Sequence, residues 1–138
     1  MKKLLSLFIV AALSTGCSKK DSAPSRKDML ASGSWHITAA TTNGVNSLQT
    51  CLSDNTYYFI SDGSATQNNG ATICTVGGDP NIRAFFFSNG DNTLTWQYTS
   101  WPDDTYTIKT ASANQFVLDL TYTNAGVNYV YEVTLTKI

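Results

Sequence analysis

Charge is scarce in this sequence. Of its 138 residues 14% are charged, and nine basic residues face ten acidic ones, which gives a formal net charge of -1. Nucleic-acid binding needs a basic surface that neutralises phosphates, and this composition does not supply one. The length fits one small domain and is too short for a TIM barrel or a two-half Rossmann enzyme.

Residues that carry catalysis are scarce as well. The chain has one histidine, His36, and none of the motifs GxGxxG, GxxxxGK[ST] or GxSxG. If Trp35 points into the core, His36 points outward, where it does not form a catalytic triad. Asp103 and Asp104 are adjacent in a loop, which is more typical of a turn than of a catalytic pair, and the sequence lacks EF-hand spacing. We therefore predict a protein that is not an enzyme, with no metal and no cofactor.

Long apolar runs are absent too. The segment from Leu4 to Leu13 has ten apolar or small residues and follows Lys2 and Lys3. It is too short to cross a bilayer comfortably and is typical of an export signal. The next residues, Ser14-Thr15-Gly16-Cys17, resemble the lipobox of bacterial lipoproteins, in which the cysteine is lipidated and becomes the mature N-terminus. An ordinary secretory signal with a coincidental cysteine is the alternative.

These features divide the chain into three parts. We predict a signal peptide over residues 1–16, a lipidated Cys17 with a flexible linker over 17–30, and a folded domain over 31–138. Two or three acyl chains, palmitate among them, would anchor the protein stably in a membrane. Ser18 after the cysteine fits sorting to the outer membrane, with the domain facing the periplasm or the cell surface.

The linker and the domain differ in charge. The linker is basic, whereas from Ala31 onward three basic and eight acidic residues give a net charge of -5. Within the linker, Ser25 to Leu30 fits one helical turn in which Ser25 and Asp28 form a capping box.

The two remaining cysteines, Cys51 and Cys74, form an even pair in an exported chain. We predict that they form one disulfide, which closes a 24-residue loop. A pair of free thiols or of metal ligands is the rival interpretation, but a structural zinc site needs four ligands and too few cysteines and histidines remain.

After Leu30 the pattern alternates with period two and shows no helical period. Turn residues such as Asn89-Gly90 separate the alternating runs. Eight short strands in hairpin order predict an all-β, antiparallel, up-and-down barrel. The expected strands are Ser34–Thr41, Asn55–Ser61, Ser64–Asn68, Arg83–Ser88, Thr93–Tyr98, Thr105–Thr110, Gln115–Thr123 and Val127–Lys137. In the first of these we expect Trp35, Ile37 and Ala39 to face inward.

The register of the last hairpin follows from its pattern. A two-residue loop at Ala125-Gly126 places apolar residues opposite one another, whereas a slip by one residue breaks every pair. The predicted inward pairs are Phe116 with Leu135, Leu118 with Val133, Leu120 with Tyr131, and Tyr122 with Tyr129. The same register opposes Asp119 and Glu132 on the outer face, where Lys109 is expected to compensate.

Several motifs together resemble the lipocalin-like domain of lipoproteins from Bacteroidetes. They are Gly33-Ser34-Trp35, then Cys51-Leu52-Ser53-Asp54-Asn55, an aromatic strand, the Asp62-Gly63 turn and a second cysteine at position 74. The similarity spans about Met29 to Ile138. It implies an eight-stranded lipocalin-like barrel on a lipid anchor, and it implies no particular reaction.

The aromatic residues are the main candidates for a ligand site. A small eight-stranded barrel is either filled by its own side chains or open as a cup for a ligand, and the sequence leaves both alternatives open. If the barrel is a cup, the candidate contacts are Trp35, Trp96, Tyr98, Trp101, Tyr122, Tyr129 and Tyr131. The favoured function is non-catalytic binding of a small, partly apolar molecule. The alternative is a packed barrel that docks on another protein of the cell envelope.

Overall fold

The computed structural model describes residues 22–74 and 80–138. It contains two short helices, α1 (Arg26–Leu30) and α2 (Thr50–Ser53), and nine strands. The strands are β1 (Ser34–Thr42), β2 (Val45–Asn46), β3 (Thr56–Phe59), β4 (Ala65–Asn68), β5 (Ile82–Ser88), β6 (Thr93–Tyr98), β7 (Asp104–Ala111), β8 (Gln115–Asn124) and β9 (Val127–Lys137). All eight expected strands are present, and the sequence analysis missed only β2 and α2. The predicted signal peptide and Cys17 lie outside the described residues.

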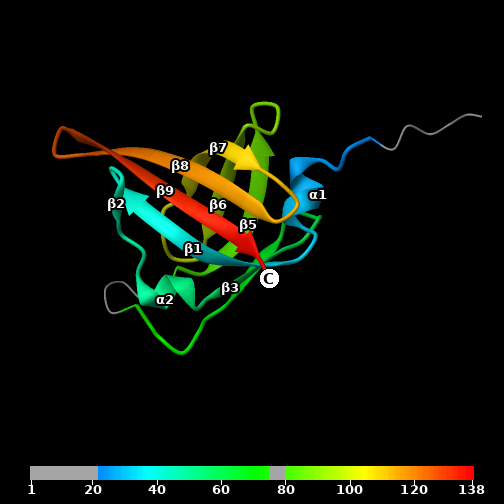
Figure 1. The fold of residues 1–138 in the computed structure, drawn as a ribbon, viewed down its shortest axis with the longest axis horizontal. Helices are drawn as coiled ribbons and strands as arrows, with labels where there is room; N and C mark the ends of the chain where they lie inside the picture. Colours follow the sequence, from blue (N-terminus) through cyan, green and yellow to red (C-terminus); the bar gives the residue numbers. More distant parts are fainter. Residues whose placement is uncertain (1–21, 75–79) are drawn as a thin grey trace, which may run out of the picture.

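The strands form a nearly closed barrel, which confirms the predicted fold (Figure 1). Eight of them follow the order β4-β3-β1-β9-β8-β7-β6-β5, and β2 pairs with β1 beside this path. The strands from β5 to β9 pair in chain order, and the last strand pairs with the first. The remaining seam lies between β4 and β5, where the isolated bridge Ser64–Ala84 joins the two edges. The backbone N–H of Phe85 also donates to the carbonyl of Gly63 across this seam, at 2.9 Å.

A β-bulge in β1 makes one of the inward predictions wrong. The pairing of β1 with β9 shifts by one residue between Ile37 and Ala39. Trp35 and Ile37 are buried as expected, but beyond the shift Ala40 is buried and Ala39 is exposed. The extra residue turns the side chain at position 39 outward.

The last hairpin has the predicted register at all four inward pairs. Its burial changes along its length. Phe116, Leu118, Val133 and Leu135 lie in the core, whereas Tyr122 is exposed and Tyr129 is half-buried. The hairpin therefore closes the core at one end of the barrel and extends past it at the other (Figure 1).

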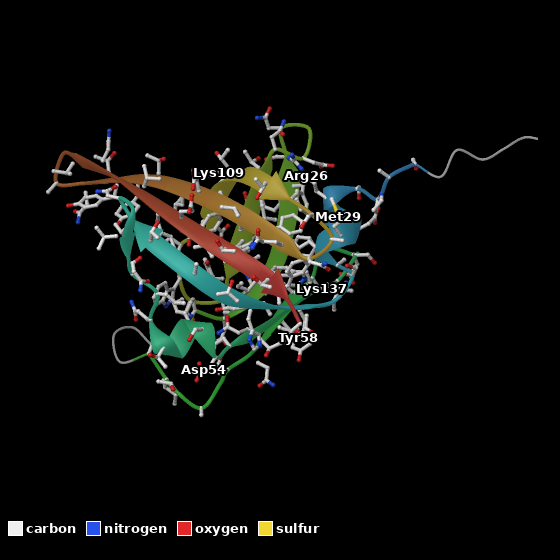
Figure 2. The ribbon with its side chains drawn as sticks, in the orientation of Figure 1. Arg26, Met29, Asp54, Tyr58, Lys109 and Lys137 are labelled. Atoms are coloured by element: carbon white, nitrogen blue, oxygen red, sulfur yellow. A yellow bond between two sulfur atoms is a disulfide. The ribbon has the colours of Figure 1, made fainter. Side chains whose placement is uncertain are left out.

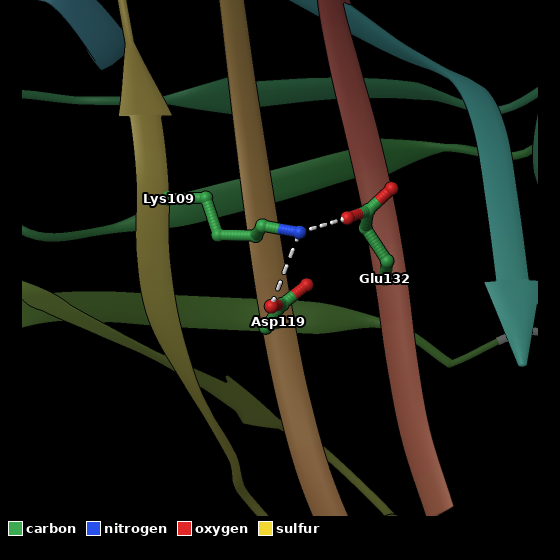
Figure 3. Close-up of polar contacts among 3 residues, drawn as sticks. All are labelled: Lys109, Asp119 and Glu132. Carbon is green, nitrogen blue, oxygen red and sulfur yellow. Dashed lines mark hydrogen bonds and ion pairs between the residues drawn. The ribbon is translucent and has the colours of Figure 1, made fainter. Parts of the chain in front are cut away.

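Residues of opposite charge neutralise one another on the outer face of this hairpin (Figure 3). Asp119 pairs with Glu132 in the register, as predicted. The Lys109 ammonium group of the next strand donates to Glu132 and lies 3.5 Å from Asp119. The hydrogen bond to Glu132 is the largest cause of a raised pKa for Lys109. The lysine thus offsets the repulsion between two opposed carboxylates, which confirms the expected compensation.

The turn of this hairpin gives a testable prediction about stability. Ala125 and Gly126 both have positive φ angles, 50° and 78°, and alanine is disfavoured in that region. Asparagine tolerates it, so Ala125→Asn should raise the free energy of unfolding by about 1 kcal/mol. Urea titration measures this change, and Ala113→Asn, in a loop with ordinary φ, is the matched control. An equal effect of both substitutions would show that the turn is not strained.

Helix α1 belongs to the folded domain. The predicted capping box is present, since Ser25 and Asp28 each accept from the other's backbone N–H. Leu30 is fully buried, and its carbonyl accepts a 2.7 Å hydrogen bond from the indole of Trp35. Arg26 of α1 also donates to Asn92 in the turn between β5 and β6. Helix α1, which lies in the segment predicted as a linker, is therefore packed against the barrel.

This helix defines the closed end of the barrel. Figure 2 shows Arg26 and Met29 on α1, at the end of the barrel where Lys137 finishes β9. Trp35 packs edge-to-face on Phe116 beneath the helix, with ring centroids 5.4 Å apart. The interior at this end is filled by side chains.

Candidate functional site

The other end of the barrel holds a pocket of about 480 Å³. This volume lies within the range of small-molecule sites. Its walls come from β1, β3, β5 to β9, α2, the loops that precede α2 and β5, and the loop between β6 and β7. The lining residues are Ile37, Thr42, Ser47, Gln49, Leu52, Tyr57, Cys74, Pro80, Ile82, Trp96, Tyr98, Trp101, Asp104, Tyr106, Tyr122, Tyr131 and Val133.

The pocket contains five of the seven aromatic residues expected to contact a ligand. They are Trp96, Tyr98, Trp101, Tyr122 and Tyr131. The other two are placed differently. Trp35 lies in the filled closed end, and Tyr129 stacks on Tyr122 with ring centroids 5.2 Å apart, without lining the pocket.

Trp96 is the central aromatic residue of the pocket floor. Its ring lies 4.9 Å from that of Tyr106 and stacks on Tyr57 at 6.2 Å, measured between centroids. The Trp96 side chain is buried, and its indole N–H has no hydrogen-bond partner among the described residues. The floor of the pocket is therefore largely aromatic, with the indole N–H as a polar group.

Asp104 is the polar feature of the pocket. The hydroxyl groups of Tyr98 and Tyr106 both donate to its Oδ2 atom, at 3.1 and 3.2 Å. Burial raises the pKa of the Asp104 carboxyl, while the two tyrosine hydrogen bonds act in the opposite direction. Burial also raises the pKa of both tyrosines, so they stay protonated and serve as donors.

The sequence analysis assigned Asp104 to a turn and missed its place in the pocket. A signal for it exists in the sequence. Asp104 and Tyr106 are two residues apart on one strand, as are Trp96 and Tyr98 on the strand before, so each pair shares a face. The register pairs Trp96 with Asp104, which brings the two inward faces together.

The predicted disulfide is present at the rim of the pocket. Cys51 of α2 bonds to Cys74, and both Cys74 and Leu52 line the pocket. Close by, Asp54 accepts a hydrogen bond from the N–H of Thr72, and the fully buried Asn55 accepts one from the N–H of Gly70. Figure 2 shows Asp54 beside α2. The Cys-x-x-Asp-Asn motif therefore holds the chain that follows β4 against the barrel.

Asp104 also bears on the chemistry that the pocket could support. A carboxylate with a raised pKa is a candidate for acid–base chemistry. However, Asp104 is the only acidic or basic side chain among the described residues that line the pocket. His36 lies elsewhere, half-buried, with its Nε2 atom 3.0 Å from the hydroxyl of Thr56. Among the described residues, no three histidine, cysteine or acidic side chains are grouped as a metal site.

Comparisons with protein-family models and with curated proteins find no match to this chain. None of the helices in the described part of the chain is long and apolar enough to span a membrane.

Proposed function

We propose that this protein is a lipid-anchored binding protein that holds a small, partly apolar molecule in the open end of its barrel. The pocket carries this proposal. It has the volume of a ligand site, a wall of aromatic and aliphatic residues, and a few polar groups at fixed positions, which is the usual constitution of such sites. It favours this function over the alternative of a filled barrel that docks on an envelope protein.

The proposed function is non-catalytic, and the proposed family is the lipocalin-like lipoproteins of Bacteroidetes. The support for the family is the sequence motifs together with the barrel fold. Two of these motifs have a clear structural role, since Trp35 fills the closed end and Asp54 and Asn55 hold the rim of the pocket.

The proposed anchor is Cys17, in the outer membrane. The apolar segment from Leu4 to Leu13 and the residues before Cys17 support it. The chain enters the barrel through α1, at the closed end. The nine residues from Cys17 to Ser25 span roughly 30 Å when fully extended. A barrel tethered in this way is attached at its closed end, opposite the pocket.

Native mass spectrometry of the protein, extracted gently from the membranes of its own host, tests both parts of the proposal. We expect a mass that begins at Cys17 and includes acyl chains, together with an adduct that is lost on denaturation. Trp101→Ala should reduce the adduct without lowering the melting temperature, because Trp101 lines the pocket and is 41% exposed.

Tyr58→Ala is the matched control for this experiment. Tyr58 lies on β3, is 40% exposed and does not line the pocket, so its removal should leave the adduct unchanged. A ligand-free mass for the wild-type protein would argue against a ligand carrier. A mass without acyl chains would argue against the anchor alone.

A further inference from the structure

We infer that the pocket selects organic cations, with the positively charged nitrogen of the ligand at Asp104 and its apolar part against the aromatic walls. This inference rests on the proposed binding function and names the class of ligand. It follows from the charge of the lining residues, from the geometry at Asp104 and from the composition of the walls.

The charge of the lining has one sign. Asp104 is its only acidic or basic residue among the described positions, and no lysine or arginine is present there to receive an anion. Asp103 follows Trp101 in the loop at the mouth and is exposed. The domain from Ala31 onward has a net charge of -5. A fatty acid or another anion would meet an unpaired carboxylate in a pocket of low dielectric, whereas a cation would neutralise it.

The geometry at Asp104 leaves room for such a charge. Both tyrosine hydrogen bonds end on Oδ2, so Oδ1 has no hydrogen bond to a described residue. The two hydroxyl groups orient the carboxylate and hold it in place. A carboxylate that is held in place, partly removed from water and without a basic partner costs free energy, and a bound cation offsets this cost.

The walls supply the second element of cation recognition. Tyrosine and tryptophan rings attract a cation through their electron-rich faces, and clusters of such rings recognise quaternary ammonium groups. Seven rings of this kind line the pocket together with Asp104: Tyr57, Trp96, Tyr98, Trp101, Tyr106, Tyr122 and Tyr131. They come from β3, from strands β6 to β9 and from the loop between β6 and β7, so they surround the ligand space from several directions.

Two probes of the same shape separate charge from apolar contact. The cation is (3-hydroxyphenyl)trimethylammonium, and its neutral counterpart is 3-tert-butylphenol. Isothermal titration calorimetry is done at pH 7, where the phenol groups of both probes are protonated and the ammonium probe is a cation. The protein is the chain from position 17 to Ile138 with Cys17→Ser, which takes no lipid and needs no detergent. We expect the cation to bind at least tenfold more tightly than the neutral probe.

The variant Asp104→Asn removes the charge and keeps the shape of the side chain. It should lower the affinity for the cation at least tenfold and leave the affinity for the neutral probe within twofold. The matched control is Asp103→Asn, which removes an adjacent, exposed charge that does not line the pocket, and it should change both affinities less than threefold. Melting temperatures of both variants confirm that they are folded.

The outcomes distinguish the two proposals. Equal affinities of the wild-type protein for both probes would overturn the selection of cations and leave the apolar binding function intact. Tighter binding of the neutral probe would do the same. No binding of either probe at millimolar concentration would count against the binding function itself, and the inference would fail with it. A cation preference that survives in Asp104→Asn would show that the charge is recognised elsewhere.

Discussion

Replacing Trp35 by alanine should lower the free energy of unfolding by about 3–5 kcal/mol. The side chain is fully buried, packs edge-to-face on Phe116 and donates its indole N–H to the carbonyl of Leu30 at 2.7 Å. Its loss leaves a large cavity at the closed end and removes the partner of a carbonyl under α1. Urea unfolding followed by circular dichroism measures the change.

Two other variants separate the causes of this loss. Trp101→Ala removes the same side chain from an exposed loop and should change the free energy of unfolding by no more than about 0.5 kcal/mol. Trp35→Phe keeps an aromatic ring but leaves the Leu30 carbonyl without its donor, which costs about 1–3 kcal/mol. If Trp35→Ala cost no more than Trp101→Ala, the closed end would not be the stable part of the barrel.

The two ends of the barrel therefore differ in role: one stabilises the fold and the other forms the pocket. The closed end combines a helix, a buried tryptophan and the inner half of the last hairpin into a filled core. The open end has the pocket, whose rim is made of loops and of strand ends that extend past the core. This division is the common one in which a rigid scaffold positions the loops that bind.

The strands could be predicted because their alternation is regular and their turns are marked by glycine and asparagine. The last hairpin was predicted in full, since only one register pairs Phe116 with Leu135 and Tyr122 with Tyr129. The bulge in β1 could not be predicted in the same way. Ala39 and Ala40 are adjacent and identical, so the pattern does not indicate which of them faces inward.

Only part of the candidate site could be predicted, because the pattern shows which residues face inward and does not show where along the barrel they lie. Large aromatic residues at alternating positions point to the interior, but alternation does not say how far along the barrel each one lies. Trp35 and Trp96 both face inward, yet Trp35 is in the filled end and Trp96 is on the pocket floor. The position along the barrel depends on the stagger between strands, which the sequence fixes only where pairing is well specified. Asp104 was missed because an acidic residue after proline and aspartate looks like part of a turn.

Reduction of the disulfide between Cys51 and Cys74 should lower the free energy of unfolding by roughly 3 kcal/mol. The two cysteines are 23 residues apart, so the bond restricts a loop of the unfolded chain that contains β3 and β4. Without it the unfolded chain gains conformational freedom. Urea titrations of the wild-type protein, with and without a reducing agent, measure the loss.

The folded barrel should survive reduction, because other contacts hold the same segment. Asp54 and Asn55 accept hydrogen bonds from the backbone of Thr72 and Gly70, and neither contact needs the disulfide. The double variant Cys51→Ala/Cys74→Ala is the control, and it should match the reduced wild-type protein and be unaffected by the reducing agent. Because the unfolded chain becomes less compact, the dependence of stability on urea should also steepen. An unchanged midpoint on reduction would mean that the bond contributes little and that Asp54 and Asn55 suffice to hold the rim of the pocket.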